Sequence, residues 1–269
     1  MHLTSTMFNS LVVGATGSIG RLVVAEALRQ GHVVRALVRT AEKARQLAAQ
    51  ARVIIGDVTR PDTLRSAVKG VDAIVFTLGS NGLGKVGAET VDYGGVRNVL
   101  GALGSQKVRI ALMTAIGVTD RTGKYNRTTE AHDWKRRSER LVRASGLPYT
   151  IVRPGWFDYN AADQHRLVLL QGDRRHAGDP SDGVIARRQI AQVLVHSLRS
   201  DQALRKTFEV VAETGSAPDD FDALFASLDA DPEGALDGVR DMANMPSDEE
   251  PQRLRDDLNA VRNQSSTAS

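Results

Sequence analysis

Short apolar runs alternate with amphipathic stretches along residues 1–211. Between the runs, apolar side chains recur at helical spacing, as in Ile19, Val23 and Ala27. Alternation of strand and helix brings the strands into one parallel sheet that is covered on both faces. The sequence therefore predicts an α/β fold with a doubly wound parallel sheet. We expect strands at residues 11–13, 33–38, 52–55, 73–78, 108–113, 149–152 and 207–211, and helices at 19–30, 61–68, 88–103, 128–145 and 189–198.

The chain changes character after residue 211. Three short apolar stripes with helical spacing follow: Phe221, Leu224, Phe225 and Leu228; Leu236, Val239 and Ala243; and Leu254, Leu258 and Val261. Ser247 and Glu250 are spaced as a capping box before the third stripe. We expect one domain over residues 1–211, an acidic helical extension over 212–263 and a disordered tail over 264–269. The stripes pack either on the domain or at a subunit interface.

Formal charge divides the chain in the same way. From Glu213 to the end there are 14 acidic and 4 basic residues, against 18 acidic and 31 basic residues before it. A basic domain suits an anionic ligand such as a phosphorylated cofactor. Scattered basic residues, an aromatic content of 4% and the lack of a recognisable motif argue against a nucleic-acid partner. The acidic extension either folds over the basic domain or stays solvated.

Composition excludes several classes of protein. The absence of cysteine rules out disulfides, thiolate catalysis and a cysteine metal site, and we expect no metal. The first ten residues lack the apolar core of a signal peptide, and no segment is apolar for long enough to span a membrane. We therefore expect a cytoplasmic protein without a membrane partner, as a monomer or a homodimer.

A G-x-x-G-x-x-G motif lies between the first expected strand and the first expected helix. Glycines permit a tight turn and close approach of a ligand, and the helix N-terminus offers unpaired N–H groups and a partial positive charge. The motif alone is weak, but this position is typical of a dinucleotide site. The alternative is a glycine-rich turn without a ligand. We predict that the pyrophosphate is bound by Gly14, Thr16, Gly17, Ser18, Ile19 and Gly20.

The end of the second strand indicates which dinucleotide binds. An NAD-binding unit usually places an acid there for the ribose 2′-hydroxyl. This chain has Arg39, 19 positions after Gly20, with Lys43 one turn further on. A guanidinium can hold a 2′-phosphate, so we predict NADP(H), the alternative being that Arg39 is an ordinary surface residue. Asp57 and Val58 are expected at the adenine, unless Asp57 only stabilises a turn.

A second glycine-rich segment follows the fourth strand. Gly79, Gly84 and Lys85 fit a nucleoside-triphosphate loop, but Val86 stands where that loop needs Ser or Thr. We interpret the segment as a flexible ligand loop at the carboxyl edge of the sheet. The residues expected to line the dinucleotide there are Thr77, Leu78 and Gly79.

Two further segments read VDYGGVRNV at residues 91–99 and GLPYTIVRPG at residues 146–155. Together with Gly14–Gly20, Arg39 and Gly56–Val58, they resemble the atypical short-chain dehydrogenase/reductases, and among these the small NAD(P)H-binding, NmrA-like group. The resemblance spans about residues 9–211 and implies a Rossmann-type sheet and hydride transfer. The acidic extension lies outside it.

The resemblance assigns further residues to the site. Lys135 matches the lysine that holds the nicotinamide ribose in that family. The tyrosine that precedes this lysine by one turn is replaced by Ala131, and Thr114 lies near the position of the family's serine. In the family, the segment after the sixth strand lines the nicotinamide pocket. The residues that match it are Pro154, Gly155, Trp156 and Phe157.

His132 is a candidate for the missing proton donor, because it lies three residues before Lys135 and titrates near neutral pH. The alternative is a helix-cap or surface histidine. The candidate catalytic residues are thus Thr114, His132 and Lys135. Trp134 and Trp156 are expected near the nicotinamide.

The implied function is an NADPH-dependent oxidoreductase. It transfers hydride to a small-molecule acceptor, which is a carbonyl, quinone, enone or flavin-like compound. Two alternatives stay open. One is a non-catalytic NADP(H) redox sensor that acts through a protein partner, and the other is an isomerase or epimerase with bound cofactor.

Overall fold

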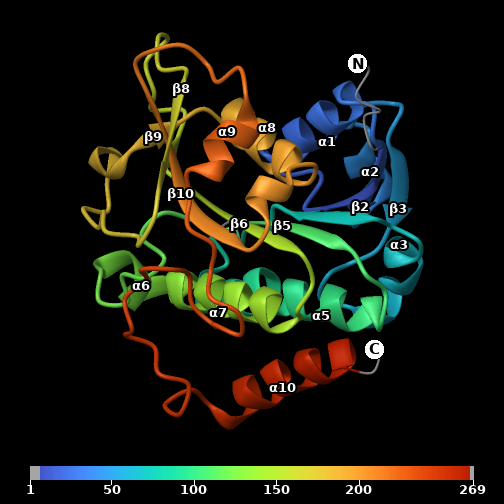
Figure 1. Cartoon of the computed structure of the whole chain (residues 1–269). Helices are drawn as coiled ribbons and strands as arrows, with labels where there is room; N and C mark the ends of the chain where they lie inside the picture. The colour runs from blue at the N-terminus through green and yellow to red at the C-terminus, as the bar shows by residue number, and fades with distance from the viewer. Residues whose placement is uncertain (1–6, 81, 267–269) are drawn as a thin grey trace.

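One mostly parallel sheet organises the molecule (Figure 1). In this computed structural model, which describes residues 7–80 and 82–266, eight strands lie in the order β3-β2-β1-β4-β5-β6-β10-β8. Neighbouring strands are parallel except β10 and β8, which are antiparallel at one edge. The predicted fold class is confirmed. The strands are β1 (Asn9–Val13), β2 (Val33–Val38), β3 (Arg52–Ile55), β4 (Ala73–Phe76), β5 (Arg109–Met113), β6 (Tyr149–Pro154), β8 (Arg166–Leu170) and β10 (Lys206–Glu213).

Helices cover both faces of the sheet (Figure 1). Leu11 and Val13 belong to the apolar core on the α5 and α7 side, and Val12 belongs to the core on the α1 and α8 side. Because both faces of the central strands are buried, these strands are near-continuous apolar runs rather than alternating patterns. The covering helices are α1 (Gly20–Arg29), α8 (Arg187–Ser197), α5 (Gly94–Leu103) and α7 (Ala131–Ala144).

Shorter elements connect and extend this frame. A π-helical stretch at Ala88–Tyr93 joins α4 to α5, a feature that often marks a functional site. β7 (Trp156–Phe157) and β9 (Val184–Ile185) form a separate parallel pair. The remaining helices are α2 (Ala41–Ala44), α3 (Arg65–Val68), α4 (Gly84–Gly87), α6 (Lys124–Thr129), α9 (Phe221–Ala226) and α10 (Gln252–Ser266), with 3₁₀ turns at Pro61–Thr63, Pro180–Asp182 and Asp201–Ala203.

The segment after β6 is more ordered than the sequence predicts. The sequence predicts no strand between residues 152 and 207, whereas β8 pairs with β10 along five residue pairs from Glu209–Leu170 to Glu213–Arg166. β8 lies at the sheet edge, and its partner follows it by about forty residues. Local periodicity therefore carries little information about this pairing.

The extension is helical only in part. Its first and third stripes form α9 and α10, but the middle stripe lies in irregular backbone, since Pro232, Gly234 and Gly238 interrupt that stretch. The predicted capping box is wrong because α10 begins after Pro251, and Glu250 instead pairs with Arg137. Disorder from residue 264 is contradicted up to 266, where α10 ends; residues 267–269 lie outside the described residues.

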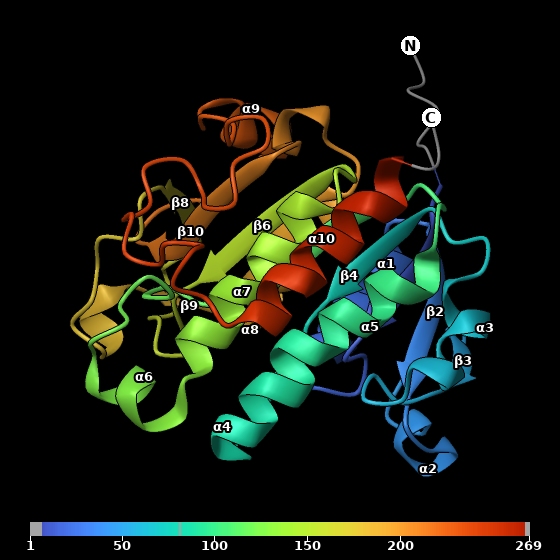
Figure 2. The same cartoon turned by 90° about the horizontal axis from the view of Figure 1, so that it is seen from below.

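The extension folds back over the arginine-rich face of α7 (Figure 2). Three arginines lie at i, i+4 and i+7 on that helix: Arg136, Arg140 and Arg143. Asp237 Oδ2 lies 2.6 Å from Arg140 Nη2, and Asp231 Oδ2 lies 3.1 Å from Arg143 Nε. α10 then lies alongside α5 and α7, with Leu254, Leu258 and Val261 in the core. Of the two arrangements left open for the acidic extension, the folded one is observed.

Candidate functional site

The glycine motif forms the turn between β1 and α1 at the carboxyl edge of the sheet. Gly14 has a φ of +89°, and a Cβ there would lie 2.8 Å from the carbonyl oxygen of Thr77. A Cβ at Gly20 would overlap the Gly14 carbonyl oxygen. The Thr77 hydroxyl donates to the carbonyl of Val13 at 3.2 Å. The turn can therefore form only without side chains at these glycines, and the N-terminus of α1 opens beside it.

This cradle fits a dinucleotide. Main-chain N–H groups at the start of a ten-residue helix can receive a phosphate where no Cβ obstructs the approach. Ser18 is exposed on the turn, Thr16 and Gly17 are half-buried, and Ile19 is buried in the core with α1 and α8. Of the loop residues predicted to bind the pyrophosphate, Ile19 therefore offers its backbone rather than its side chain.

Arg39 and Lys43 are exposed at the end of β2 and on α2. Within residues 7–80 and 82–266, neither side chain forms an ion pair or a hydrogen bond. β2 lies directly beside β1, with Leu37 opposite Val13, so Arg39 follows the strand that neighbours the glycine turn. Both cations are thus free to bind an anion on that side of the turn.

Asp57 is engaged by its own loop. Its Oδ1 accepts hydrogen bonds from the backbone N–H and the hydroxyl of Thr59, at 2.9 Å and 2.8 Å. This is the turn-stabilising role that the sequence left as the alternative. Val58 is half-buried, and its carbonyl accepts a bond from Asn98 Nδ2 at 2.7 Å. The segment is held against α5 and forms a fixed rim beside β3.

The segment after β4 is packed tightly against α5. Leu78 is buried, and a Cβ at Gly95 would lie 2.7 Å from Leu78 Cδ1. Gly79 is exposed, which leaves its backbone accessible at the same edge of the sheet as Gly14. Lys85 pairs with Glu130 at 2.8 Å, so its ammonium is neutralised by the protein itself.

Lys135 and Thr114 each have a buried carboxylate partner. Lys135 Nζ lies 3.2 Å from Oδ1 of Asp92, which belongs to the π-helical stretch. The Thr114 hydroxyl donates to Glu139 Oε1 at 2.7 Å, and Glu139 is fully buried beside Arg153. The single hydroxyl proton of Thr114 is used in this contact, so Thr114 cannot donate to a substrate in this arrangement.

His132 lies on the first turn of α7, beside the loop that follows β5. Its ring is 5.1 Å from that of Tyr125, and a Cβ at Gly117 would lie 3.6 Å from its Cε1. Burial lowers the pKa of His132, against the opposing effect of Asp173, so the ring is neutral at pH 7. Its Nδ1 is buried without a hydrogen-bond partner among the described residues. This nitrogen is able to exchange a proton only with a ligand that reaches the buried side of the ring.

The segment predicted to line the nicotinamide begins at the end of β6. Gly155 lies so close to Gly183 that a Cβ would be 2.5 Å from its carbonyl oxygen, and Pro154 and Gly155 are buried. Trp156 and Phe157 are half-buried in β7. The segment lies at the same edge of the sheet as the glycine turn, because β6 and β1 are strands of one parallel sheet.

Two residues that the sequence did not single out help to build the site. Arg187, at the start of α8, donates to the Ser18 hydroxyl at 3.1 Å, pairs with Asp158 and lies over the ring of Phe157. Asp173 accepts backbone bonds from Gly117 and Thr119 at 2.6 Å and 2.7 Å. Both join segments far apart in the chain, so no local pattern could have indicated them.

The fold and the site define a class of protein that binds a nicotinamide dinucleotide at the carboxyl ends of parallel strands. A family model described as NAD(P)H-binding matches residues 14–201, and the chain belongs to this family. The resemblance seen in the motifs is thereby confirmed. The matched region ends before β10 and the extension.

Individual proteins agree with this placement. The chain is 28% identical to an uncharacterized chloroplast protein of Arabidopsis thaliana over 84% of this chain and 77% of that one. It is 26% identical to sanguinarine reductase of Eschscholzia californica, over 84% and 97% of the two chains. A putative NAD-dependent epimerase/dehydratase from Bacillus halodurans has the same fold, with a TM-score of 0.68, 24% identity and coverage of 81% and 99%.

One solved structure with this fold contains NADP. A wide-type short-chain dehydrogenase/reductase from Veillonella parvula is in complex with NADP. It has a TM-score of 0.58 and 18% identity, over 80% of this chain and all of that one. In the described part of this chain, no helix is both long and apolar enough to cross a membrane.

Proposed function

We propose that this protein is an NADPH-dependent reductase of small-molecule acceptors. The observation that carries the proposal is the unpaired Arg39, which follows the strand beside the glycine cradle, with Lys43 also unpaired on α2. A free guanidinium at this position can hold a 2′-phosphate through paired hydrogen bonds. Sanguinarine reductase, which is similar to this chain over 97% of its own length, supports reduction as the reaction.

Each part of the site has a defined task in this proposal. The glycine turn and the start of α1 bind the pyrophosphate, and Arg39 selects the phosphorylated ribose. Lys135, held by Asp92, would donate to the nicotinamide ribose, and Pro154–Phe157 would form the wall behind the ring. When bound, the nicotinamide supplies a hydride.

The proton comes from a residue of the protein or, if the acceptor is easily reduced, from water. Ala131 has no hydroxyl, and the Thr114 hydroxyl already donates to Glu139. His132 is the remaining candidate, with an unpartnered Nδ1 and a pKa lowered by burial. Because the ring is mostly neutral at pH 7, few protons are available from it, which suits an acceptor that is reduced easily, such as a quinone or an enone, better than a simple ketone.

Cofactor titrations test the assignment of Arg39. Trp134 is buried against Tyr93 and Arg253 of α10, so its fluorescence also responds to α10. A Trp134→Phe background leaves Trp156 as the reporter of binding. In it, Arg39→Ala should weaken NADPH binding about tenfold or more, the worth of one charge-assisted contact, and leave NADH binding unchanged.

Arg45→Ala is the matched control, since Arg45 is also an exposed arginine at the end of α2. This variant loses the same positive charge as Arg39→Ala, but from a position that is not beside the glycine cradle. A 2′-phosphate site at Arg39 would be disproved if the unsubstituted chain bound NADPH and NADH equally well. It would also be disproved if Arg39→Ala and Arg45→Ala lost the same amount of NADPH affinity.

Turnover separates the reductase from its alternatives. With menadione as quinone acceptor, the protein should oxidise NADPH, and His132→Ala should lower kcat at least tenfold without changing NADPH affinity. The engaged Thr114 hydroxyl and the alanine at position 131 favour the redox sensor as the second candidate. A sensor would discriminate NADPH from NADP⁺ and consume neither with any acceptor.

A further inference from the structure

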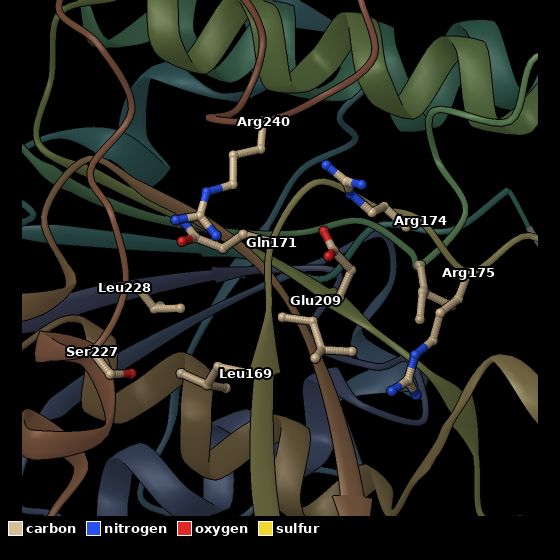
Figure 3. Close-up of a pocket in the computed structure, with 10 residues that line it drawn as sticks. Leu169, Gln171, Arg174, Arg175, Glu209, Ser227, Leu228 and Arg240 are labelled. Carbon is tan, nitrogen blue, oxygen red and sulfur yellow. The ribbon is translucent and has the colours of Figure 1, made fainter.

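A second cavity lies outside the dinucleotide cradle, between β8, β10 and the extension (Figure 3). Its volume is about 360 Å³, at the small end of the range for ligand pockets. None of the residues predicted to bind the dinucleotide lines it. The lining residues are Ile116, Leu169, Leu170, Gln171, Arg174, Arg175, Glu209, Ser227, Leu228 and Arg240.

The cavity has an apolar side and a charged side. Figure 3 shows Leu169 and Leu228 on one side, and Arg174, Arg240 and the carboxylate of Glu209 on the other. The arrangement fits a ligand with an apolar body and one charged end. A uniformly polar solute would leave the leucines in contact with water, and a purely apolar one would bury the charged groups without partners.

Positive charge prevails on the charged side. Three arginines line the cavity, and within residues 7–80 and 82–266 only Arg240 is paired with an outside carboxylate, that of Asp229. Arg175 donates to the carbonyl of Asp182 at 3.1 Å. The guanidinium of Arg174 has no acceptor among the described residues. Set against Asp229 and Glu209, the three arginines leave one positive charge when Glu209 is ionised and two when it is protonated.

Glu209 is the buried acid of this cavity. Its side chain is 2% exposed, and its Oε2 accepts a bond from the backbone N–H of Asp173 at 3.1 Å. Burial raises its pKa to about 7, although Arg153 at 3.2 Å acts in the opposite direction. A carboxyl in this state can donate a hydrogen bond to an anionic ligand as well as accept one.

The extension closes the cavity. Gln171 exchanges hydrogen bonds with the backbone of Asp229, donating at 2.9 Å and accepting at 3.0 Å, which holds the 227–229 segment beside β8. Arg240 packs on Gly172, where a Cβ would lie 3.0 Å from the Arg240 carbonyl oxygen. Ser227, Leu228 and Arg240 lie beyond residues 14–201, so the match to the family model does not extend to this wall.

We propose that this cavity binds a small organic monoanion, a carboxylate with an apolar body. Arg174 and Arg240 hold its carboxylate from two sides, and Leu169 and Leu228 enclose its apolar part. A single negative charge matches the positive charge that is left when Glu209 is ionised, whereas a phosphate monoester would bring about two negative charges. This binding goes beyond the proposed reductase activity and does not require a bound dinucleotide.

The test uses the full chain without cofactor and follows ligand binding by NMR line broadening. The probes are benzoate and hexanoate, each compared with its neutral amide at the same ionic strength. We expect both carboxylates to bind at least tenfold more tightly than their amides. Arg174→Gln and Arg240→Gln should each weaken benzoate binding at least fivefold.

Arg65→Gln is the matched control, because Arg65 is exposed on α3, near the opposite edge of the sheet. This variant should leave benzoate binding unchanged. Equal binding of carboxylates and amides would overturn the proposal, as would no carboxylate binding at 10 mM. Equal losses in Arg65→Gln and Arg174→Gln would also overturn it, since the effect would then come from net charge. Circular dichroism of each variant verifies that it is folded.

Discussion

Asp173 is a buried carboxylate in the left-handed backbone region, with a φ of 45°. Although burial opposes ionisation, bonds from His176, Gly117 and Thr119 together with the charge of Arg153 lower its pKa to about 2. It holds the loop after β5, which carries Gly117 beside His132. Its charge therefore stabilises the candidate catalytic segment as well as the fold.

Asp173→Asn should lower the free energy of unfolding by about 2 kcal/mol at pH 7. The folded pKa lies below the unfolded value of 3.8, so the ionised carboxylate contributes stability that is fully present above pH 4. This contribution is lost as the pH falls from about 4 to 2. The free energies of unfolding of the unsubstituted chain and of Asp173→Asn should therefore converge in this range. Urea unfolding at pH 7 and pH 3 measures the difference. Asp62→Asn, at an exposed carboxylate, serves as the control and should change stability little at either pH.

The pH dependence of carboxylate binding tests the role of Glu209. Besides the arginines of the cavity, Glu209 faces Arg153 of β6 and Asp173, with His176 beside Asp173. An anion in the cavity disfavours the ionised form of Glu209, so binding takes up a proton. Benzoate affinity should therefore fall by about tenfold between pH 6 and pH 8. Affinity that is constant over this range, measured by NMR titration, would exclude Glu209 from contact with the ligand.

At the scale of elements, the two glycines Gly20 and Gly101 are a matched pair. Gly20 lies in α1 and Gly101 in α5, which cover opposite faces of the sheet. A Cβ at Gly20 would overlap the Gly14 carbonyl, whereas a Cβ at Gly101 would meet no atom within 4 Å. Gly101→Ala should raise stability by about 0.5–1 kcal/mol, because alanine costs less backbone entropy in a helix.

Gly20→Ala should have the opposite effect. The turn between β1 and α1 must shift, so we expect a loss above about 2 kcal/mol and NADPH affinity at least tenfold weaker. Thermal unfolding and the Trp156 titration measure the two effects. If Gly20→Ala changed neither the stability nor the NADPH affinity, the turn would adapt freely and close approach of the ligand to the turn would not be required.

At the scale of the whole molecule, α10 covers the α5 and α7 layer. Leu254 is 2% exposed there, whereas Asn259 on the same helix is exposed. Leu254→Asp should detach α10, shift Trp134 emission to the red and promote self-association through the uncovered apolar face. Asn259→Asp adds the same charge and should change neither signal. Tryptophan emission and light scattering distinguish the two variants, and identical behaviour would show that α10 is not held by its apolar stripe.

Much of the fold could be predicted from the sequence because its signals are local. The strands 33–38 and 52–55 occur at the predicted boundaries, and the glycine turn is where the motif placed it. Short edge strands such as β8 and the irregular middle of the extension were missed, since long-range pairing and helix-breaking residues decide them. Arg39 could be singled out because it follows Gly20 at a fixed spacing, with Lys43 one turn further on, and their binding of a 2′-phosphate stays a prediction.

By itself, the sequence determined the layers of the molecule, the position of the glycine cradle and the unequal charge of the two parts of the chain. These depend on periodicity and composition, which are properties of neighbouring residues. The tertiary structure alone decided that Asp237 and Asp231 pair with arginines of α7, that Thr114 donates to Glu139, and that Arg174 and Arg240 share one cavity. Such contacts join residues that are tens of positions apart, and the sheet and the returning extension bring them together.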